Sequence, residues 1–181
     1  METIKCIKER RSIRKFQSKK VPHEVIEEII EAAAFAPSWK NTQVTRYIIT
    51  EDQAKMNKIA DSCVLGFEYN IDTLRNAPAL VILTMIEGRS GLEKDGSATT
   101  PKGAEWGVFD TGAAAQTFCL AAHDKGIGSV IMGIFDEYKV SQVIPIPEGQ
   151  KVAALIAIGY ADEEPKAPRR KSVAELVTYA D

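Results

Sequence analysis

A cluster of cationic side chains near the start of the chain is the strongest candidate for chemistry in this sequence. Arg10, Arg11 and Arg14 lie within five positions, and Ser12 adds a hydroxyl group. The planar guanidinium group carries paired donors that match phosphate oxygens, and a well-aligned charge-assisted hydrogen bond contributes about 1.5–3 kcal/mol. The cluster therefore indicates either a phosphate site or a solvated basic face.

Side chains that would form another kind of active site are scattered. The cysteines Cys6, Cys63 and Cys119 are odd in number and far apart, which argues against a disulfide framework or a zinc site. His23 and His123 are the only histidines, and we expect both at the surface or at helix ends. The sequence has no nucleotide-binding glycine motif of the P-loop or G-x-G-x-x-G type. We expect no metal site and no catalytic side chain, so a cofactor would carry the chemistry.

The charge of the chain is unevenly distributed. Residues 1–20 carry eight cations and two acids, and residues 166–181 carry four cations and two acids, whereas the net charge of the whole chain is −2. The stretch between them is therefore acidic. A nucleic-acid-binding protein more often spreads its basic patch across the surface. We expect instead that the two basic ends meet around one small anion, with no nucleic acid as partner.

Length and composition favour an ordinary globular protein. The 181 residues, 45% hydrophobic and 27% charged, fit a single domain over 1–181. No apolar run is long enough to span a membrane, and the N-terminus does not resemble a signal peptide. We therefore expect a cytoplasmic protein without a membrane partner.

Helices and strands are interspersed without a regular βαβ alternation, which favours the α+β class. Apolar spacing and helix-terminating residues predict helices over 2–9, 22–35, 51–63, 67–76, 104–125, 136–143 and 172–179. Runs of β-branched and apolar residues predict strands over 44–50, 79–86 and 152–160, and a strand or extended chain over 127–135.

Two segments between these elements have an ambiguous role. The helix over 104–125 is apolar nearly all round, which is typical of a central helix or of a helix in a subunit interface. The glycine-rich stretch 88–103 is long for a structureless connection, so it is either a lid or a solvated insertion.

Five segments, taken in order, resemble the FMN-dependent nitroreductase family over essentially the whole chain. They are R-R-S-I-R at 10–14, A-P-S-W-K-N-T-Q at 36–43, Asn70 seven residues before Ala77-Pro78, D-T-G-A-A-A-Q at 110–116 with G-I-G-S at 126–129, and I-G-Y at 158–160 followed by Pro165 and Arg170-Lys171. The resemblance implies a three-layer α+β fold, with a mostly antiparallel central sheet flanked by helices, in an intertwined homodimer.

The resemblance also implies an FMN site shared between the two subunits. The groups implied at the FMN phosphate and ribityl chain are Arg10, Arg11, Ser12, Arg14 and, from the C-terminal end, Arg170 in preference to Arg169. Asn70 would bond the edge of the flavin ring. The residues implied to reach the flavin from the partner subunit are Pro37, Ser38, Trp39 and Asn41, with Gln43 bracing their loop. The residues implied to line one flavin face are Val130, Ile131, Met132 and Gly133.

Each assignment has a purely structural alternative. The C-terminal arginines would equally suit a solvated tail, Asn70 a helix cap, Trp39 ordinary packing, and residues 130–133 a core strand. The chain also departs from the family, because Val44-Thr45-Arg46 stands where many members have Pro-Trp, and Met132 stands where some members have an acid. These departures affect the substrate and the electron donor more than the fold.

The reaction implied by the resemblance needs no protein acid. NADH or NADPH would pass hydride to flavin N5 and leave, and a small acceptor, nitroaromatic or quinone-like, would then bind the same face in a ping-pong cycle. Two alternatives remain open: a different donor of the ferredoxin type, and a flavin-binding sensor or carrier without NAD(P)H turnover.

Overall fold

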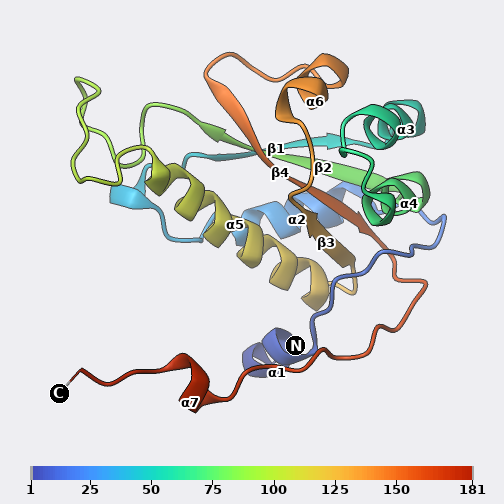
Figure 1. Ribbon diagram of the computed structural model, residues 1–181. Helices are drawn as coiled ribbons and strands as arrows, with labels where there is room; N and C mark the ends of the chain where they lie inside the picture. The colour runs from blue at the N-terminus through green and yellow to red at the C-terminus, as the bar shows by residue number, and fades with distance from the viewer. Residues whose placement is uncertain (1, 181) are drawn as a thin grey trace.

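A four-stranded sheet is the middle layer of the computed structural model, which describes residues 2–180 (Figure 1). The strands are β1 (Thr45–Thr50), β2 (Ala79–Ile86), β3 (Gly128–Met132) and β4 (Gln150–Gly159). Their order is β1-β2-β4-β3, and every neighbouring pair is antiparallel. Of the predicted strand or extended chain over 127–135, only Gly128–Met132 pairs with β4; beyond it the chain leaves β4, and the carbonyl of Ile134 accepts the side-chain amide of Asn70.

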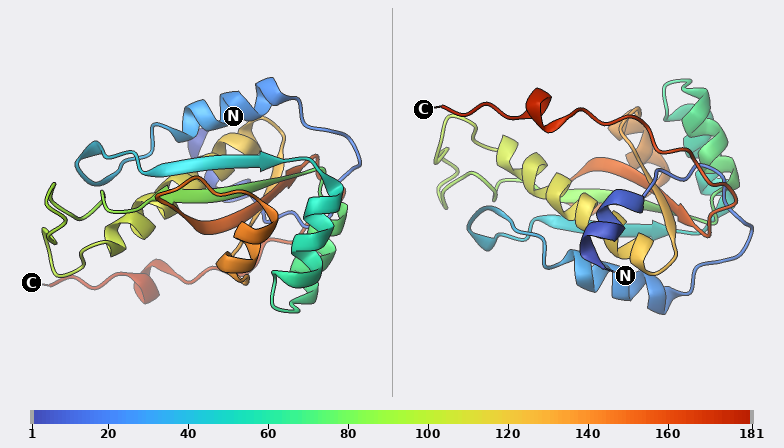
Figure 2. Two further views of the ribbon diagram at one scale, coloured as in Figure 1. Left: turned by 90° about the horizontal axis from the view of Figure 1, so that it is seen from above. Right: turned by 90° about the horizontal axis from the view of Figure 1, so that it is seen from below.

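Helices cover both faces of the sheet, as the two-sided apolar run of β2 requires. Leu80 and Ile82 pack toward one helical layer, whereas Val81 and Leu83 pack toward the other. The first layer holds α3 (Gln53–Ser62), α4 (Glu68–Asn76) and α6 (Glu137–Val143), and the second holds α2 (His23–Ala33) and α5 (Glu105–Asp124) (Figure 2). The predicted three-layer α+β fold with an antiparallel sheet is therefore confirmed.

The long helix α5 has one buried apolar face and one exposed apolar face. Phe118 is fully buried and stacks on Tyr47 with ring centroids 5.6 Å apart. Val108 and Phe109, nearer the start of the helix, are exposed, Phe109 by 68%. Packing within one chain therefore explains the buried apolar residues of α5, but not the exposed Val108 and Phe109.

The arginine segment, residues 10–14, lies along the outer edge of β3. It follows α1 (Thr3–Glu9), whose Cys6 thiol contacts the carbonyl of Leu120 on α5. The backbone N–H of Ile13 donates to the carbonyl of Ser129 at 3.0 Å, and Ser12 forms a parallel bridge to Ser129. These contacts fix the backbone that carries the arginines.

The C-terminal residues leave the body of the molecule. After β4 the chain runs in extended form past α1 to the short helix α7 (Val173–Leu176) (Figure 1). A capping box between Ser172 and Glu175 closes the start of α7, yet Val173 and Leu176 are exposed. No helix within residues 2–180 has the length and apolar character needed to cross a membrane.

Candidate functional site

The two basic ends of the chain meet in one cavity of about 440 Å³, as their charge predicted. It is lined by Arg10, Arg11, Ser12, Arg14, Pro165, Lys166, Pro168 and Arg170. Among residues 2–180, five cations and no carboxylate line this space, so it suits a dianion such as a phosphate group. The Nε atom of Arg10 is buried without a hydrogen-bond partner among the described residues, which is the state expected of a donor placed for a bound acceptor.

The three arginines of the segment differ in their contacts. Arg11 donates from Nη1 to the carbonyls of Lys8 at 2.6 Å and Arg10 at 2.8 Å, so it also terminates α1. Arg14 lines both the cationic cavity and a neighbouring cavity. Its backbone N–H donates to the Glu163 carboxylate. Arg14 is therefore the residue that joins the two spaces.

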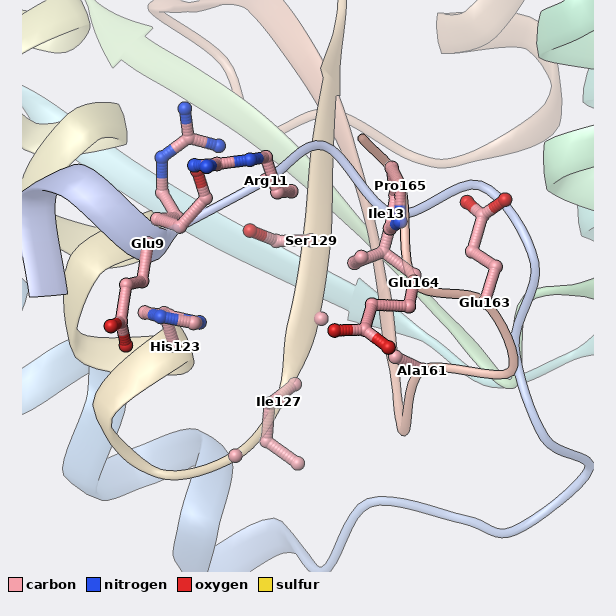
Figure 3. A pocket seen from close by; sticks show the side chains of 13 residues that line it. Glu9, Arg11, Ile13, His123, Ile127, Ser129, Ala161, Glu163, Glu164 and Pro165 are labelled. Atoms are coloured by element: carbon pink, nitrogen blue, oxygen red, sulfur yellow. The ribbon is translucent and has the colours of Figure 1, made fainter. Parts of the chain in front are cut away.

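A larger cavity of about 670 Å³ on the other side of the arginine segment is a poorer anion site. Glu9 and His123 lie on one side of it, and Glu163 and Glu164 on the other (Figure 3). The carboxylates of Glu9, Glu163 and Glu164 would repel an anion bound in this cavity. Burial, followed by the charge of Arg10, lowers the pKa of His123 below its usual range, so this imidazole is neutral near pH 7.

A cavity of about 340 Å³ next to the cationic one is mainly apolar. Asn70, buried inside α4, donates its side-chain amide to the carbonyl of Ile134 at 3.1 Å, so it is not a helix cap. A Cβ added to Gly133 would meet no protein atom within 4 Å, so the space beside this glycine is open. One amide at the edge of an open apolar slot, beside a cationic pocket, fits a planar ring that carries a phosphate tail.

The strand residues predicted to line a flavin face fall into two groups. Val130 and Met132 are buried in the core with α3, α4 and α6, so they border the cavity mainly through their backbone. Ile131 points outward and is 44% exposed. The pleat of β3 explains this split, because successive side chains point to opposite faces.

Three residues that line the apolar cavity were missed by sequence reasoning: Phe67, Tyr69 and Ile134. Phe67 and Tyr69, at the start of α4, form a tilted aromatic pair with ring centroids 5.6 Å apart. Their signal was the presence of two aromatic residues just before Asn70, in a helix that otherwise carries few apolar groups.

The loop predicted to reach the flavin lies at the other end of the molecule. Trp39, in the 3-10 turn Trp39–Asn41, donates its backbone N–H to Asp110 in the second turn of α5. β3 follows the far end of α5, and Asp110 and Asp124 are separated by about 21 Å at 1.5 Å per residue. One chain therefore does not bring Pro37, Ser38, Trp39 and Asn41 to the cavity lined by Asn70 (Figure 1).

The backbone of this loop is strained. Lys40, Asn41 and Gln43 have positive φ values of 45°, 55° and 47°. Each such non-glycine residue costs about 1–3 kcal/mol, so the conformation persists only where surrounding contacts offset that cost. Gln43 braces the loop as predicted: its backbone N–H donates to the Ser38 hydroxyl at 2.9 Å and its side chain to Asn41 at 3.2 Å. Strain of this kind concentrates at functional sites.

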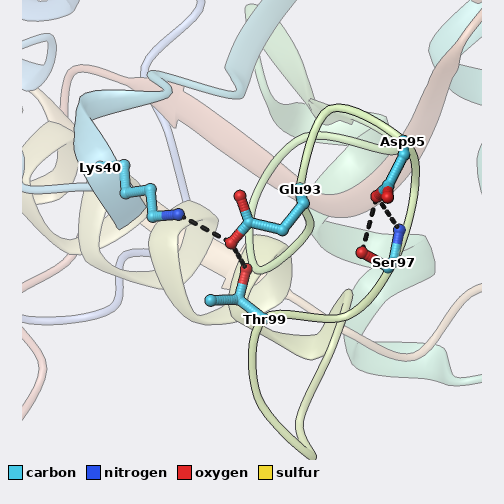
Figure 4. A network of polar contacts seen from close by, with 5 residues as sticks. All are labelled: Lys40, Glu93, Asp95, Ser97 and Thr99. Carbon is cyan, nitrogen blue, oxygen red and sulfur yellow. Dashed lines mark hydrogen bonds and ion pairs between the residues drawn. The ribbon is translucent and has the colours of Figure 1, made fainter.

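The glycine-rich stretch 88–103 folds on itself and contacts this loop. Glu93 accepts hydrogen bonds from the Thr99 hydroxyl at 2.7 Å and from the Lys40 ammonium group at 3.0 Å (Figure 4). These two contacts lower the pKa of Glu93 below its usual range. The rings of Trp39 and Trp106 lie 5.1 Å apart. The loop and the glycine-rich stretch therefore form one unit at the N-terminal end of α5.

Comparisons with known proteins show which proteins the chain resembles in sequence and in fold. The model of the nitroreductase family matches residues 7–160. A protein of Archaeoglobus fulgidus with the provisional name NADH dehydrogenase/NAD(P)H nitroreductase is 30% identical, covering 90% of this chain and 87% of that protein. The NADPH-flavin oxidoreductase of Vibrio harveyi is 28% identical, covering 93% and 69%. Among solved structures, the FMN-dependent nitroreductase of Clostridium difficile R20291 is 26% identical with a TM-score of 0.78, covering 98% and 99%.

Proposed function

The chain belongs to the nitroreductase family, and from this premise we propose that it is an FMN-dependent oxidoreductase that uses NAD(P)H. The whole chain, 1–181, forms one FMN-binding domain. The observation that carries the proposal is the pair of adjacent cavities that share Arg14, one cationic and one apolar with a single amide. Together they match the two halves of FMN, a phosphate tail and a planar ring.

Each part of the paired cavity has a distinct role. Arg10, Arg14 and Arg170 neutralise the phosphate charge, and the Ser12 hydroxyl adds a donor. Asn70 orients the ring edge, and the space beside Gly133 lets the ring approach the backbone of the chain. When bound, FMN supplies the transfer of hydride from NAD(P)H to a small acceptor, nitroaromatic or quinone-like, with both reactants using the same face in turn.

A second copy of the chain completes the site. The loop with Pro37, Ser38, Trp39 and Asn41 lies far from its own chain's ring cavity, so a partner subunit supplies it. Large apolar side chains are exposed on three helices of the chain: Ile4 and Ile7 on α1, Val108 and Phe109 on α5, and Val173 and Leu176 on α7. Such extensive exposed apolar surface is typical of a subunit interface and therefore supports a homodimer in which it would be buried.

Flavin titration tests the cofactor assignment. The wild-type protein should bind FMN, and Arg10→Ala combined with Arg14→Ala should weaken binding at least tenfold if the pair contributes more than about 1.4 kcal/mol. Arg75→Ala is the matched control, because Arg75 is an exposed cation in the last turn of α4 that pairs with Asp61 of α3 and lines neither cavity. A wild-type protein that binds no FMN would refute the proposal.

Anaerobic reduction tests the electron donor. Added NADH or NADPH should rapidly bleach the visible band of the bound flavin, and a nitroaromatic or quinone acceptor should restore it. Flavin that stays oxidised would instead support a ferredoxin-type donor or a sensor or carrier role. Light scattering tests the assembly, and a monomeric FMN-bound protein would contradict the shared site.

A further inference from the structure

One buried carboxylate links the two segments at the N-terminal end of α5. Asp110 is 4% exposed. Its Oδ2 atom accepts the backbone N–H of Trp39 at 2.9 Å and the hydroxyl of Ser90 at 2.6 Å. We propose that Asp110 is a positioning residue that holds the loop 37–43 in the conformation required at the partner subunit's flavin. This rests on the proposed function, because it assigns that loop to the flavin.

The contact with Trp39 meets a need of the backbone. Trp39 begins a 3-10 turn, so its N–H has no acceptor within the turn, and Ser38 offers no side-chain cap there. The Ser38 hydroxyl is already used by the backbone N–H of Gln43. Asp110 thus acts as the cap of the turn from a distant part of the sequence, and its removal leaves a backbone donor unpaired.

The strained backbone makes this anchor important. Three positive φ values within four residues, at Lys40, Asn41 and Gln43, describe a conformation that the chain leaves when it is not held. The contact between Lys40 and Glu93 is exposed (Figure 4), and exposed ion pairs hold a loop weakly. Asp110 is the buried polar attachment of this loop to α5 among the described residues.

The position of Asp110 also explains why α5 carries an acid among apolar residues. The same oxygen receives Ser90, the third residue of the stretch 88–103, so this stretch and the loop are held to one point of the helix. Ser90 is itself buried. Removing the Ser90 hydroxyl therefore tests one arm of the link without touching the other.

Hydrogen exchange on the full-length protein without added FMN tests the anchor directly. Asp110→Ala should accelerate amide exchange in residues 38–43 tenfold or more, while exchange in residues 114–122 of α5 stays unchanged. Asp110→Asn, whose amide oxygen still accepts, should give a smaller effect and guards against a misfolded alanine variant. Ser90→Ala should act on residues 88–92 and leave 38–43 slow. Unchanged exchange in 38–43 for both Asp110 variants would overturn the proposal.

Mixed dimers test whether the loop serves the partner's flavin. A dimer of one Asp110→Ala chain and one Arg14→Ala chain keeps one intact site if the loop crosses over, so about half of the wild-type activity should remain. A dimer with both changes in one chain and a wild-type partner has no intact site and should lose most activity. The reverse pattern would overturn the crossing. A wild-type protein that binds no FMN would sink the proposed function, whereas the exchange experiment would still decide whether Asp110 holds the loop.

Discussion

The contact between Gly128 and Ile13 sets how closely the arginine segment lies on the sheet. A Cβ added at Gly128 would lie 2.9 Å from Cβ and Cγ1 of Ile13 and 3.0 Å from its Cγ2. Carbon atoms in ordinary contact are about 3.5–4.0 Å apart, so Gly128→Ala forces a displacement of roughly 0.5–1 Å. Because Ile13 lies between Ser12 and Arg14, the displacement moves the groups assigned to the FMN phosphate.

The magnitude follows from the packing. Inserting one methyl group into a filled contact costs about 1–3 kcal/mol. If all of this strain is relieved by moving the arginine segment outward, the FMN dissociation constant rises about 5- to 150-fold. The hydrogen bond from Ile13 to Ser129 weakens at the same time, and a bond of this kind contributes about 0.5–1.5 kcal/mol to the free energy of unfolding.

FMN titration and thermal unfolding of the apoprotein measure the two effects separately. Ile13→Ala removes two of the three atoms that overlap, so the double variant should be less impaired than the sum of the single variants. Strict additivity would show that no overlap exists. An unchanged FMN affinity with a lowered unfolding temperature would show that the arginine segment does not hold the phosphate.

Three further predictions concern the helix α5 and its surroundings. Phe118→Ala should lower the free energy of unfolding by about 3–5 kcal/mol in a denaturant titration, because it leaves a cavity in the core. Because the pKa of His123 is lower in the folded protein, the unfolded chain binds this proton more readily. The free energy of unfolding should therefore be highest above pH 6.5 and fall as the pH drops through the lowered pKa. His123→Gln should remove this step from unfolding curves measured at successive pH values. Gly112 is exposed with open space around it, so Gly112→Ala should raise the free energy of unfolding of an isolated chain by up to about 1 kcal/mol. If the same variant raises the dimer dissociation constant in ultracentrifugation, this face of α5 lies in the subunit interface.

Much of the fold is predictable from the sequence because the decisive patterns are local. The apolar run 79–86 predicts a strand buried on both faces, and the spacing of Ile26 and Ile29 predicts the buried face of α2. Element ends are less predictable, because long-range contacts decide them. β3 stops at Met132, and the carbonyl of Ile134 just beyond it accepts the side-chain amide of Asn70. The residues around Ile134 and around Asn70 give no local sign of this contact.

The site is predictable in its composition but not in its geometry. Charge alone indicates that the two basic ends of the chain meet, and the arginine segment and Arg170 do line one cavity. The alternation along β3 is expected, yet which of Val130 and Ile131 faces the core depends on the register with β4. The role of Asp110 depends on a contact across 71 positions of sequence, which no local pattern reports.

The arginine segment has a second consequence, for the behaviour of the protein in concentrated solution. β3 is an outermost strand, and its free side is covered by the bridge between Ser12 and Ser129 and by the N–H of Ile13. An uncovered outermost strand offers unpaired backbone groups to other chains and promotes aggregation. Any change that frees residues 10–14 therefore exposes a template for intermolecular strand pairing, so cofactor retention and colloidal stability depend on the same short stretch of chain.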